Sequence, residues 1–146
     1  MDFKVQTSIR VRFADVDAMG HVNNAKFFTY MEQGRMNYFR RFPDLDFTRG
    51  HPGEGISLIL AKIQCQFLSP ALMDEELIVR LATTEIRRSS FSMEYEINEA
   101  SSGRAVAKGE SVQVYYDYAA KRSLEIPAEL RKRFEELEGR KFEAKP

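Results

Sequence analysis

Alternating side chains predict a short β-strand near the start of the chain. Between residues 4 and 13 every second position is β-branched, namely Val5, Thr7, Ile9 and Val11. This period of two places one face of a strand on a core. The next residues, 15–24, are rich in Asp, Asn and Gly, which favour turns and helix caps. We therefore expect a strand followed by a loop that ends at a helix.

The apolar positions then change to a helical spacing. After residue 24 they recur at intervals of three and four until Pro43, at Ala25, Phe27, Phe28, Tyr30, Met31, Gly34, Tyr38, Phe39 and Phe42. Asn23 is the expected N-cap of this long, mostly buried helix, and Pro43 ends the run. Gly34 costs about 1 kcal/mol relative to Ala in mid-helix, so we expect a neighbouring element to approach closely there.

Alternation returns after a Gly- and Pro-rich connection at residues 43–55. It predicts four more strands, over residues 61–67, 77–87, 91–97 and 105–116. Short turn-rich links between them favour antiparallel neighbours. The last strand carries small side chains on one face, at Ala105, Ala107, Gly109 and Ser111, so a helix should pack closely over it. A short amphipathic helix is expected at residues 127–138.

These elements predict one α+β domain over residues 1–146, with an antiparallel sheet curled around one long helix. A chain of 146 residues has room for a single core. One helix covers only one face of a sheet. Apolar residues on the other face favour self-association, as a homodimer or a homotetramer, which would bury that face or lengthen the sheet.

Composition excludes several classes of protein. The 22 Lys and Arg residues balance 22 Asp and Glu residues, unlike a basic nucleic-acid binder. No apolar run approaches the roughly 20 residues that span a bilayer. A single cysteine and an N-terminus without a signal-peptide pattern predict a cytoplasmic protein. Cys65 lies among alternating apolar residues and is expected to be a small buried hydrophobe. His51 has no ligand-type neighbour at short spacing, so no metal site is expected.

Residues 13–27, FADVDAMGHVNNAKF, resemble the signature of the hotdog-fold thioesterases. The pattern is similar to the 4-hydroxybenzoyl-CoA thioesterase branch, and HVNN is also similar to bacterial long-chain acyl-CoA and plant acyl-ACP thioesterases. Residues 67–71 and 85–91 resemble two strands of that family, so the likeness extends over residues 5–125. The resemblance implies the hotdog fold and hydrolysis of acyl-CoA, with coenzyme A as part of the substrate and no separate cofactor.

The resemblance implies that Asp17 is the essential carboxylate, as nucleophile or general base, since the branches of the family differ on this. Asp15 is expected to be structural. Free N–H groups at a helix start carry partial positive charge, so the amide of Asn24 could polarise a thioester carbonyl. His21 either orients water or the carboxylate, or only hydrogen-bonds the loop. The plant-like branch carries Asn where this chain has Met19, so its full arrangement is absent.

Three further residues are candidates for binding substrate. Glu32 matches a position that touches the acyl group in the hydroxybenzoyl branch, but an ordinary helix ion pair with Arg35 also explains it. Arg87 and Arg88 resemble the basic residues that meet the phosphates of coenzyme A. On a regular strand only one of these two would face the substrate. The alternative for both is a solvated face.

The sequence therefore favours an acyl-CoA thioesterase, with a mild preference for medium- or long-chain fatty acyl groups because the long helix is rich in aromatic residues and Met. An acyl-ACP thioesterase is the alternative enzyme, and it would have an acyl carrier protein as partner. A non-catalytic hotdog module that binds acyl-CoA is the alternative from another class. A hotdog dehydratase or hydratase needs His, Asp or Glu arrangements that this chain lacks.

Overall fold

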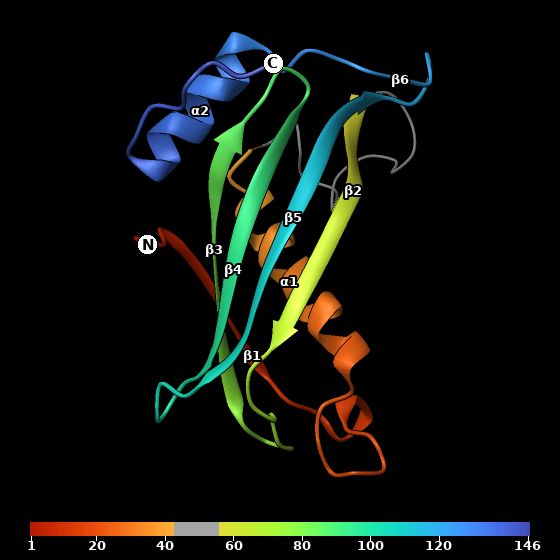
Figure 1. Ribbon diagram of the computed structural model, residues 1–146, viewed down its shortest axis with the longest axis vertical. Coiled ribbons are helices and arrows are strands. Elements are labelled where there is room, and N and C mark those ends of the chain that lie inside the picture. Colours follow the sequence, from red (N-terminus) through yellow and green to blue (C-terminus); the bar gives the residue numbers. More distant parts are fainter. Residues whose placement is uncertain (43–55) are drawn as a thin grey trace.

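The computed structural model describes residues 1–42 and 56–146. Within these residues the chain forms a strand, a short 3-10 turn at Phe13–Asp15, a long helix, five more strands and a final helix (Figure 1). The strands are β1 Val5–Arg10, β2 Ile56–Phe67, β3 Glu76–Ile86, β4 Ser90–Glu99, β5 Ala105–Asp117 and β6 Arg122–Ser123. The helices are α1 Asn24–Phe39 and α2 Ala128–Glu138.

The strands form one antiparallel sheet in the order β1-β3-β4-β5-β2, with β6 added to the end of β5. The sheet curls around α1, and α2 lies across the end that holds the β3–β4 turn (Figure 1). The expected α+β architecture is confirmed. Some boundaries differ: β1 ends at Arg10, before the 3-10 turn, and β2 begins at Ile56 rather than Ala61. The helix α1 ends at Phe39, before the expected stop at Pro43, and the short strand β6 was not predicted. The connection expected at residues 43–55 lies outside the described residues.

Two glycines let the helix lie close to the sheet. A Cβ at Gly34 of α1 would meet the Val79 side chain at 3.1 Å, which explains the tolerated mid-helix glycine. On the other side of the contact, a Cβ at Gly109 of β5 would lie 2.5 Å from Met31 Cε and 2.9 Å from the Gln64 carbonyl oxygen. The small face predicted for this strand therefore meets the helix at Gly109, as expected, whereas Ala105 at the start of the strand is exposed.

The last helix closes one end of the core. Phe134 of α2 is fully buried and its ring lies 4.7 Å from that of Phe42 and 4.8 Å from that of Phe91. Glu138 accepts hydrogen bonds from the Tyr38 hydroxyl at 2.6 Å and the Thr83 N–H at 2.8 Å. These contacts attach α2 to both the sheet and α1.

The outer face of the sheet is more polar than the sequence suggested. Arg80, Glu96 and Lys108 follow one another across β3, β4 and β5. The expectation of an apolar outer face is therefore wrong at the centre of the sheet. A different feature favours self-association: β2 is an edge strand of 12 residues that pairs with β5 on one side, within the described sheet, and carries the exposed Leu60 and Phe67.

Neither described helix has both the length and the apolar composition needed to span a membrane.

Candidate active site

Asp17 and His21 face each other across a tight turn. The Asp17 N–H donates to the His21 carbonyl at 2.8 Å, and the Gly20 N–H donates back to the Asp17 carbonyl at 3.0 Å. Gly20 has φ +85°, a left-handed conformation that favours glycine at this position. The Asp17 carboxylate accepts the Met19 N–H at 2.9 Å and is otherwise exposed to solvent. The turn thus presents a carboxylate at the surface.

Asp15, two residues earlier, has a different environment. Its side chain is 1% exposed and accepts hydrogen bonds from the Tyr30 hydroxyl at 2.8 Å and from Arg12 Nη2 at 2.9 Å. Burial raises the pKa of Asp15, but the hydrogen bonds from Arg12 and Tyr30 outweigh it and hold the pKa below its ordinary value. Asp15 joins the turn to α1, in agreement with the structural role expected for it.

The start of α1 lies beside this turn. Asn23 is the N-cap, as predicted, and its side chain accepts the Ala25 N–H at 3.0 Å. Its own N–H donates to the Asp15 carbonyl at 2.9 Å. Within residues 1–42 and 56–146, the Asn24 N–H has no acceptor. It is the first amide of a helix of 16 residues, where the helix dipole favours a negative charge.

This geometry brings three of the predicted residues together. The segment 15–17 runs antiparallel to 21–23, with a bridge between Val16 and Val22. Asp17 therefore lies opposite His21, and Asp15 lies opposite Asn23, the residue before the helix start. Asp17 and Asp15 are two residues apart, or roughly 7 Å of extended backbone. An exposed carboxylate and an unpaired helix amide on adjacent segments can act on a carbonyl carbon and its oxygen.

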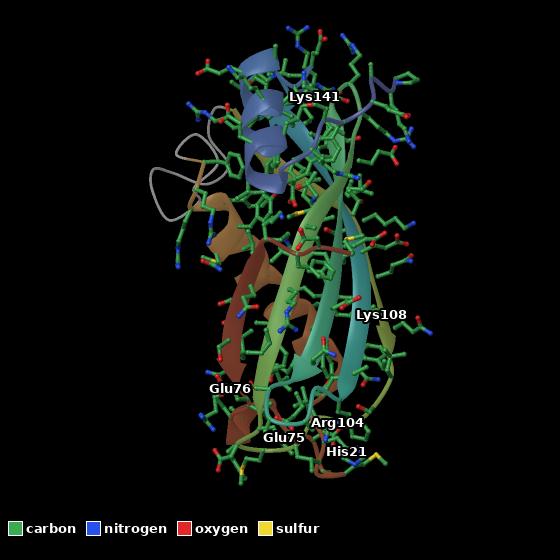
Figure 2. The ribbon with its side chains drawn as sticks, turned by 90° about the vertical axis from the view of Figure 1, so that its left-hand side faces the viewer. His21, Glu75, Glu76, Arg104, Lys108 and Lys141 are labelled. Atoms are coloured by element: carbon green, nitrogen blue, oxygen red, sulfur yellow. The ribbon has the colours of Figure 1, made fainter. Side chains whose placement is uncertain are left out.

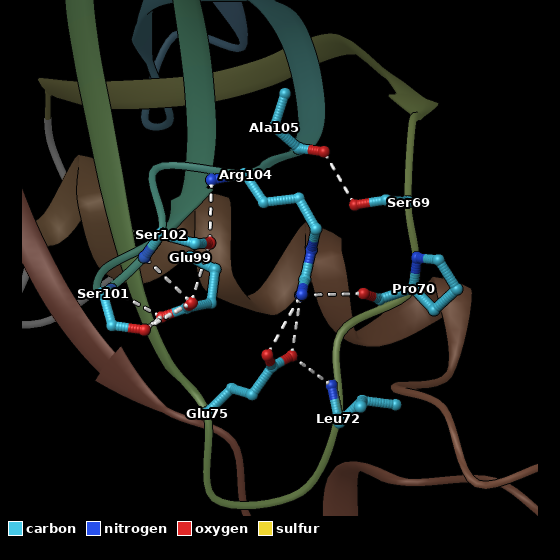
Figure 3. Close-up of polar contacts among 9 residues, drawn as sticks. All are labelled: Ser69, Pro70, Leu72, Glu75, Glu99, Ser101, Ser102, Arg104 and Ala105. Atoms are coloured by element: carbon cyan, nitrogen blue, oxygen red, sulfur yellow. Dashed lines mark hydrogen bonds and ion pairs between the residues drawn. The ribbon is translucent and has the colours of Figure 1, made fainter.

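A second loop supports the turn. The Val22 N–H donates to the Ala71 carbonyl at 2.9 Å. The loop that carries Ala71 is held by Arg104, whose Nη2 donates to the Pro70 carbonyl at 3.1 Å and pairs with Glu75 at 2.8 Å (Figure 3). Glu75 also accepts the Leu72 N–H at 2.7 Å. Sequence reasoning did not identify Arg104 as a support, because it acts on residues about 30 positions away.

Beside Arg104, the turn between β4 and β5 is closed by a carboxylate. Glu99 accepts hydrogen bonds from the hydroxyl and N–H groups of Ser101 and Ser102, and these lower the pKa of Glu99 to about 2 (Figure 3). Figure 2 shows His21, Glu75 and Arg104 at the same end of the molecule, with Lys141 at the opposite end.

The two predicted phosphate-binding arginines lie away from Asp17. Arg87 and Arg88 occupy the turn between β3 and β4, which is closed by the Arg87 N–H and the Ser90 carbonyl at 2.7 Å. This turn is at the α2 end of the sheet, opposite the Asp17 turn (Figure 1). The strand placement expected for the two arginines is therefore wrong, and the rule of alternating faces does not apply to them. Both are exposed, and Arg87 pairs with Glu85 at 2.6 Å.

Glu32 lines a cavity of about 300 Å³ between α1 and β2. The other lining residues are Arg35, Met36, Phe39, Leu58, Leu60 and Gln113. The helix ion pair considered for Glu32 and Arg35 does not form. Arg35 instead turns inward and is 8% exposed. The sequence carried a signal for this that was missed, since Arg35 stands four residues from Met31 and four from Phe39, in the buried row of the helix.

The described residues offer little for other chemistry. Burial raises the pKa of the Cys65 thiol to about 11, which disfavours the thiolate, although the side chain is half-buried rather than fully buried as expected. No group of three or more His, Cys, Asp or Glu side chains that could hold a metal ion occurs in the part of the chain that the structure describes. His51 lies outside that part.

Comparison with known proteins identifies the family of this arrangement. Residues 11–134 match the family model described as Thioesterase-like superfamily. A crystal structure of a thioesterase from Thermus thermophilus, complexed with coenzyme A and Zn, superposes with a TM-score of 0.81 at 36% sequence identity, covering 94% of this chain and 97% of that chain. The expected hotdog fold is thereby confirmed.

Two curated relatives are more distant in sequence. The long-chain acyl-CoA thioesterase FadM of Escherichia coli (strain K12) is 23% identical over 133 residues, which cover 91% of this chain and 98% of FadM. The uncharacterized protein YsmA of Bacillus subtilis (strain 168) is 28% identical over 93 residues, covering 64% of this chain and 60% of the length of YsmA.

Proposed function

This chain belongs to the thioesterase-like superfamily, and from that premise we propose that it hydrolyses acyl-CoA to the free acid and coenzyme A. The Thermus relative, at 36% identity, is complexed with coenzyme A, and FadM is named for long-chain acyl-CoA. One observation carries the proposal. The exposed carboxylate of Asp17 and the N–H of Asn24, which has no acceptor among the described residues, lie on two segments joined side by side at the start of α1.

In the proposed reaction, the Asn24 N–H donates a hydrogen bond to the thioester oxygen as negative charge develops on it. The Asp17 carboxylate either takes a proton from water, whose oxygen then attacks the carbonyl carbon, or attacks that carbon itself and forms an anhydride that water opens. The C–S bond breaks in both routes, and the sulfur of coenzyme A leaves and is protonated. His21, across the turn from Asp17, orients the water or the carboxylate.

The acyl group follows α1 in this proposal. Apolar side chains of Met36, Phe39 and Leu58 line the cavity between α1 and β2, and this supports a medium- or long-chain fatty acyl group. Glu32 borders the same cavity and contacts the acyl group. Coenzyme A enters only as part of the substrate, and the reaction needs no other cofactor.

The phosphates of coenzyme A bind Arg87 and Arg88 of a second copy. These arginines are in the β3–β4 turn and Asp17 is in the loop before α1, and these two segments lie at opposite ends of the molecule (Figure 1). Antiparallel pairing of two β2 edges reverses one copy relative to the other, so the arginine end of one copy lies beside the Asp17 end of its partner. The exposed β2 edge of 12 residues supports such a homodimer, which can pair further into a tetramer.

Replacement of Asp17 tests the catalytic role of its carboxylate. We expect Asp17→Asn to lower kcat/KM for acyl-CoA by a factor of roughly 100 or more, because the amide cannot act as base or nucleophile. The measurement is release of free thiol from short, long and aromatic acyl-CoA esters. Asp117→Asn is the matched control, because each aspartate accepts a backbone N–H two residues ahead, from Met19 and Ala119 respectively, both at 2.9 Å.

Unchanged turnover in Asp17→Asn would remove this carboxylate from the mechanism. If the wild-type protein cleaved no CoA ester, the same assay with acyl-ACP would test the carrier-protein alternative. Failure there as well would leave a non-catalytic module, which binding of acyl-CoA without hydrolysis would identify.

A further inference from the structure

Arg35 is a charged residue in the buried row of α1. It is 8% exposed, while Met31 and Phe39, one turn away on either side, are 0% and 2% exposed. Its Nη1 donates to the Tyr95 hydroxyl at 3.2 Å. Among residues 1–42 and 56–146, no carboxylate pairs with its guanidinium, and its other N–H groups have no acceptor. Among the described residues the one partner of this largely buried cation is therefore a neutral hydroxyl, which compensates poorly for its burial, so its retention calls for a reason.

The protein groups behind Arg35 are already satisfied by one another. The Tyr95 hydroxyl lies 2.6 Å from Ser111 Oγ, and Ser111 donates to the side-chain oxygen of Gln113. Gln113 Nε2 donates in turn to the Phe91 carbonyl at 3.3 Å. This chain of hydrogen bonds ends on the backbone and uses none of the remaining N–H groups of Arg35. The unused donors of Arg35 are left to the cavity between α1 and β2.

The cavity itself is suited to a chain with one polar end. Its walls include the apolar side chains of Met36, Leu58 and Leu60, and Arg35 is the cationic residue among those that line it. Glu32 also borders the cavity but is exposed and does not pair with Arg35. In binding pockets, a few polar groups among apolar walls fix which ligand is held and in which orientation.

The position of Arg35 along the helix sets a length. Arg35 lies 11 residues after Asn24, or about 16 Å along the helix axis at 1.5 Å per residue. An extended chain advances roughly 1.2 Å per bond, so about 13 bonds separate a group at the Asn24 amide from one at Arg35. A thioester held at Asn24, as in the proposed function, therefore brings only the far end of a long acyl group to the guanidinium.

We propose that Arg35 makes the enzyme selective for long acyl groups that end in a carboxylate, that is, for the mono-CoA thioesters of dicarboxylic acids. The acyl chain follows α1 from Asn24, its far end enters the cavity beside Glu32, and its terminal carboxylate pairs with the unused N–H groups of the guanidinium. Such a pair supplies both the missing negative charge and geometrically matched acceptors. This inference rests on the proposed function for the position of the thioester.

The test compares substrates that differ only at the far end. The substrates are dodecanedioyl-, tetradecanedioyl- and hexadecanedioyl-CoA, each compared with the plain acyl-CoA of equal length. For at least one of these lengths we expect the wild-type kcat/KM to be roughly tenfold higher for the dicarboxylic substrate. Arg35→Met should reverse this preference, since it keeps the length of the side chain and removes its charge. Arg35→Lys should retain part of it. Tyr95→Phe is the matched control, because it removes the protein partner of Arg35 but leaves the cation.

Glu32→Gln should change the substrate preference in the opposite direction to Arg35→Met. It removes the anion that borders the cavity, so the preference for the terminal carboxylate should rise if that carboxylate binds Arg35. A ratio of the two kcat/KM values that is the same in wild type and in folded Arg35→Met would overturn the inference, as would wild-type preference for the plain chain.

A readout without turnover separates this inference from the proposed function. Free dodecanedioic acid should raise the Tm of the wild-type protein more than dodecanoic acid does, and Arg35→Met should lose that difference. If no CoA ester is cleaved but this shift is seen, the proposed function fails and the binding role of Arg35 stands. If esters are cleaved through Asp17 and neither the kinetics nor the Tm depends on Arg35, only the selectivity is wrong.

Discussion

At the scale of single residues, the two aspartates of the site show how burial separates roles within three positions. Asp15 is 1% exposed and binds Arg12 and Tyr30, whereas Asp17 is exposed and accepts only the Met19 N–H within the described structure. A buried, hydrogen-bonded carboxylate stabilises the fold, and an exposed one is available to substrate. We therefore expect substitution of the two residues to affect different properties.

Asp15→Asn should lower the free energy of unfolding at neutral pH by roughly 1–3 kcal/mol, because the buried Tyr30 hydroxyl and the Arg12 guanidinium lose a charged acceptor. The folded-state pKa of Asp15 lies below its ordinary value of 3.8. The stability that the charge contributes is thus complete above that ordinary value and disappears as the pH falls through the lowered pKa. Urea unfolding of wild type and variant at pH 7 and below pH 4 measures this.

The difference in the free energy of unfolding between wild type and Asp15→Asn should accordingly become smaller at acidic pH. Asp17→Asn serves as the control, since its exposed side chain keeps an acceptor for the Met19 N–H and its stability should match wild type. A stability gap for Asp15→Asn that is constant with pH would contradict the role assigned to its charge.

At the scale of elements, the contact of α1 with β5 depends on small side chains. Gly109→Ala would place a Cβ 2.5 Å from Met31 Cε and 2.9 Å from the Gln64 carbonyl oxygen, and backbone moves less readily than a flexible side chain. We expect a loss of roughly 1–3 kcal/mol in the free energy of unfolding, as for other overpacked cores. Lys108→Ala, at the neighbouring exposed position, is the control. Equal urea midpoints for Gly109→Ala and wild type would show that the helix can move away.

At the scale of the whole molecule, the β3–β4 turn, which carries Arg87 and Arg88, and the loop before α1, which carries Asp17, lie at opposite ends of the molecule (Figure 1). A homodimer through β2 would bring them to one site. Arg88→Ala should then raise KM for acyl-CoA by roughly tenfold with kcat unchanged, because it removes a phosphate contact that is equal in ground and transition states. The KM of Arg88→Lys should lie between those of wild type and Arg88→Ala, since lysine keeps the charge but loses the bidentate geometry.

The solution mass provides the companion measurement. We expect a mass of about twice the 16.9 kDa of the chain, or a further doubling for the tetramer. A monomer that still hydrolyses acyl-CoA with an unchanged KM in Arg88→Ala would reject the shared site.

Local patterns of this sequence determined most of its elements. The N-cap at Asn23, the close approach at Gly34 and the small face around Gly109 were all predicted, because capping, helix period and strand period depend on residues a few positions apart. The motif at residues 13–27 led to the family for the same reason, since its residues form one continuous turn and helix start.

Tertiary structure decided what depends on distant segments. Arg87 and Arg88 are in a turn at the far end, because the pairing of β3 with β4 fixes where that hairpin closes. The outer face of the sheet is polar at its centre because the strand register places Arg80, Glu96 and Lys108 next to one another. Arg35 is paired with Tyr95 and not with Glu32, because the sheet, 60 residues later in the chain, supplies a buried acceptor. Long-range packing sets these positions, and no local spacing encodes it.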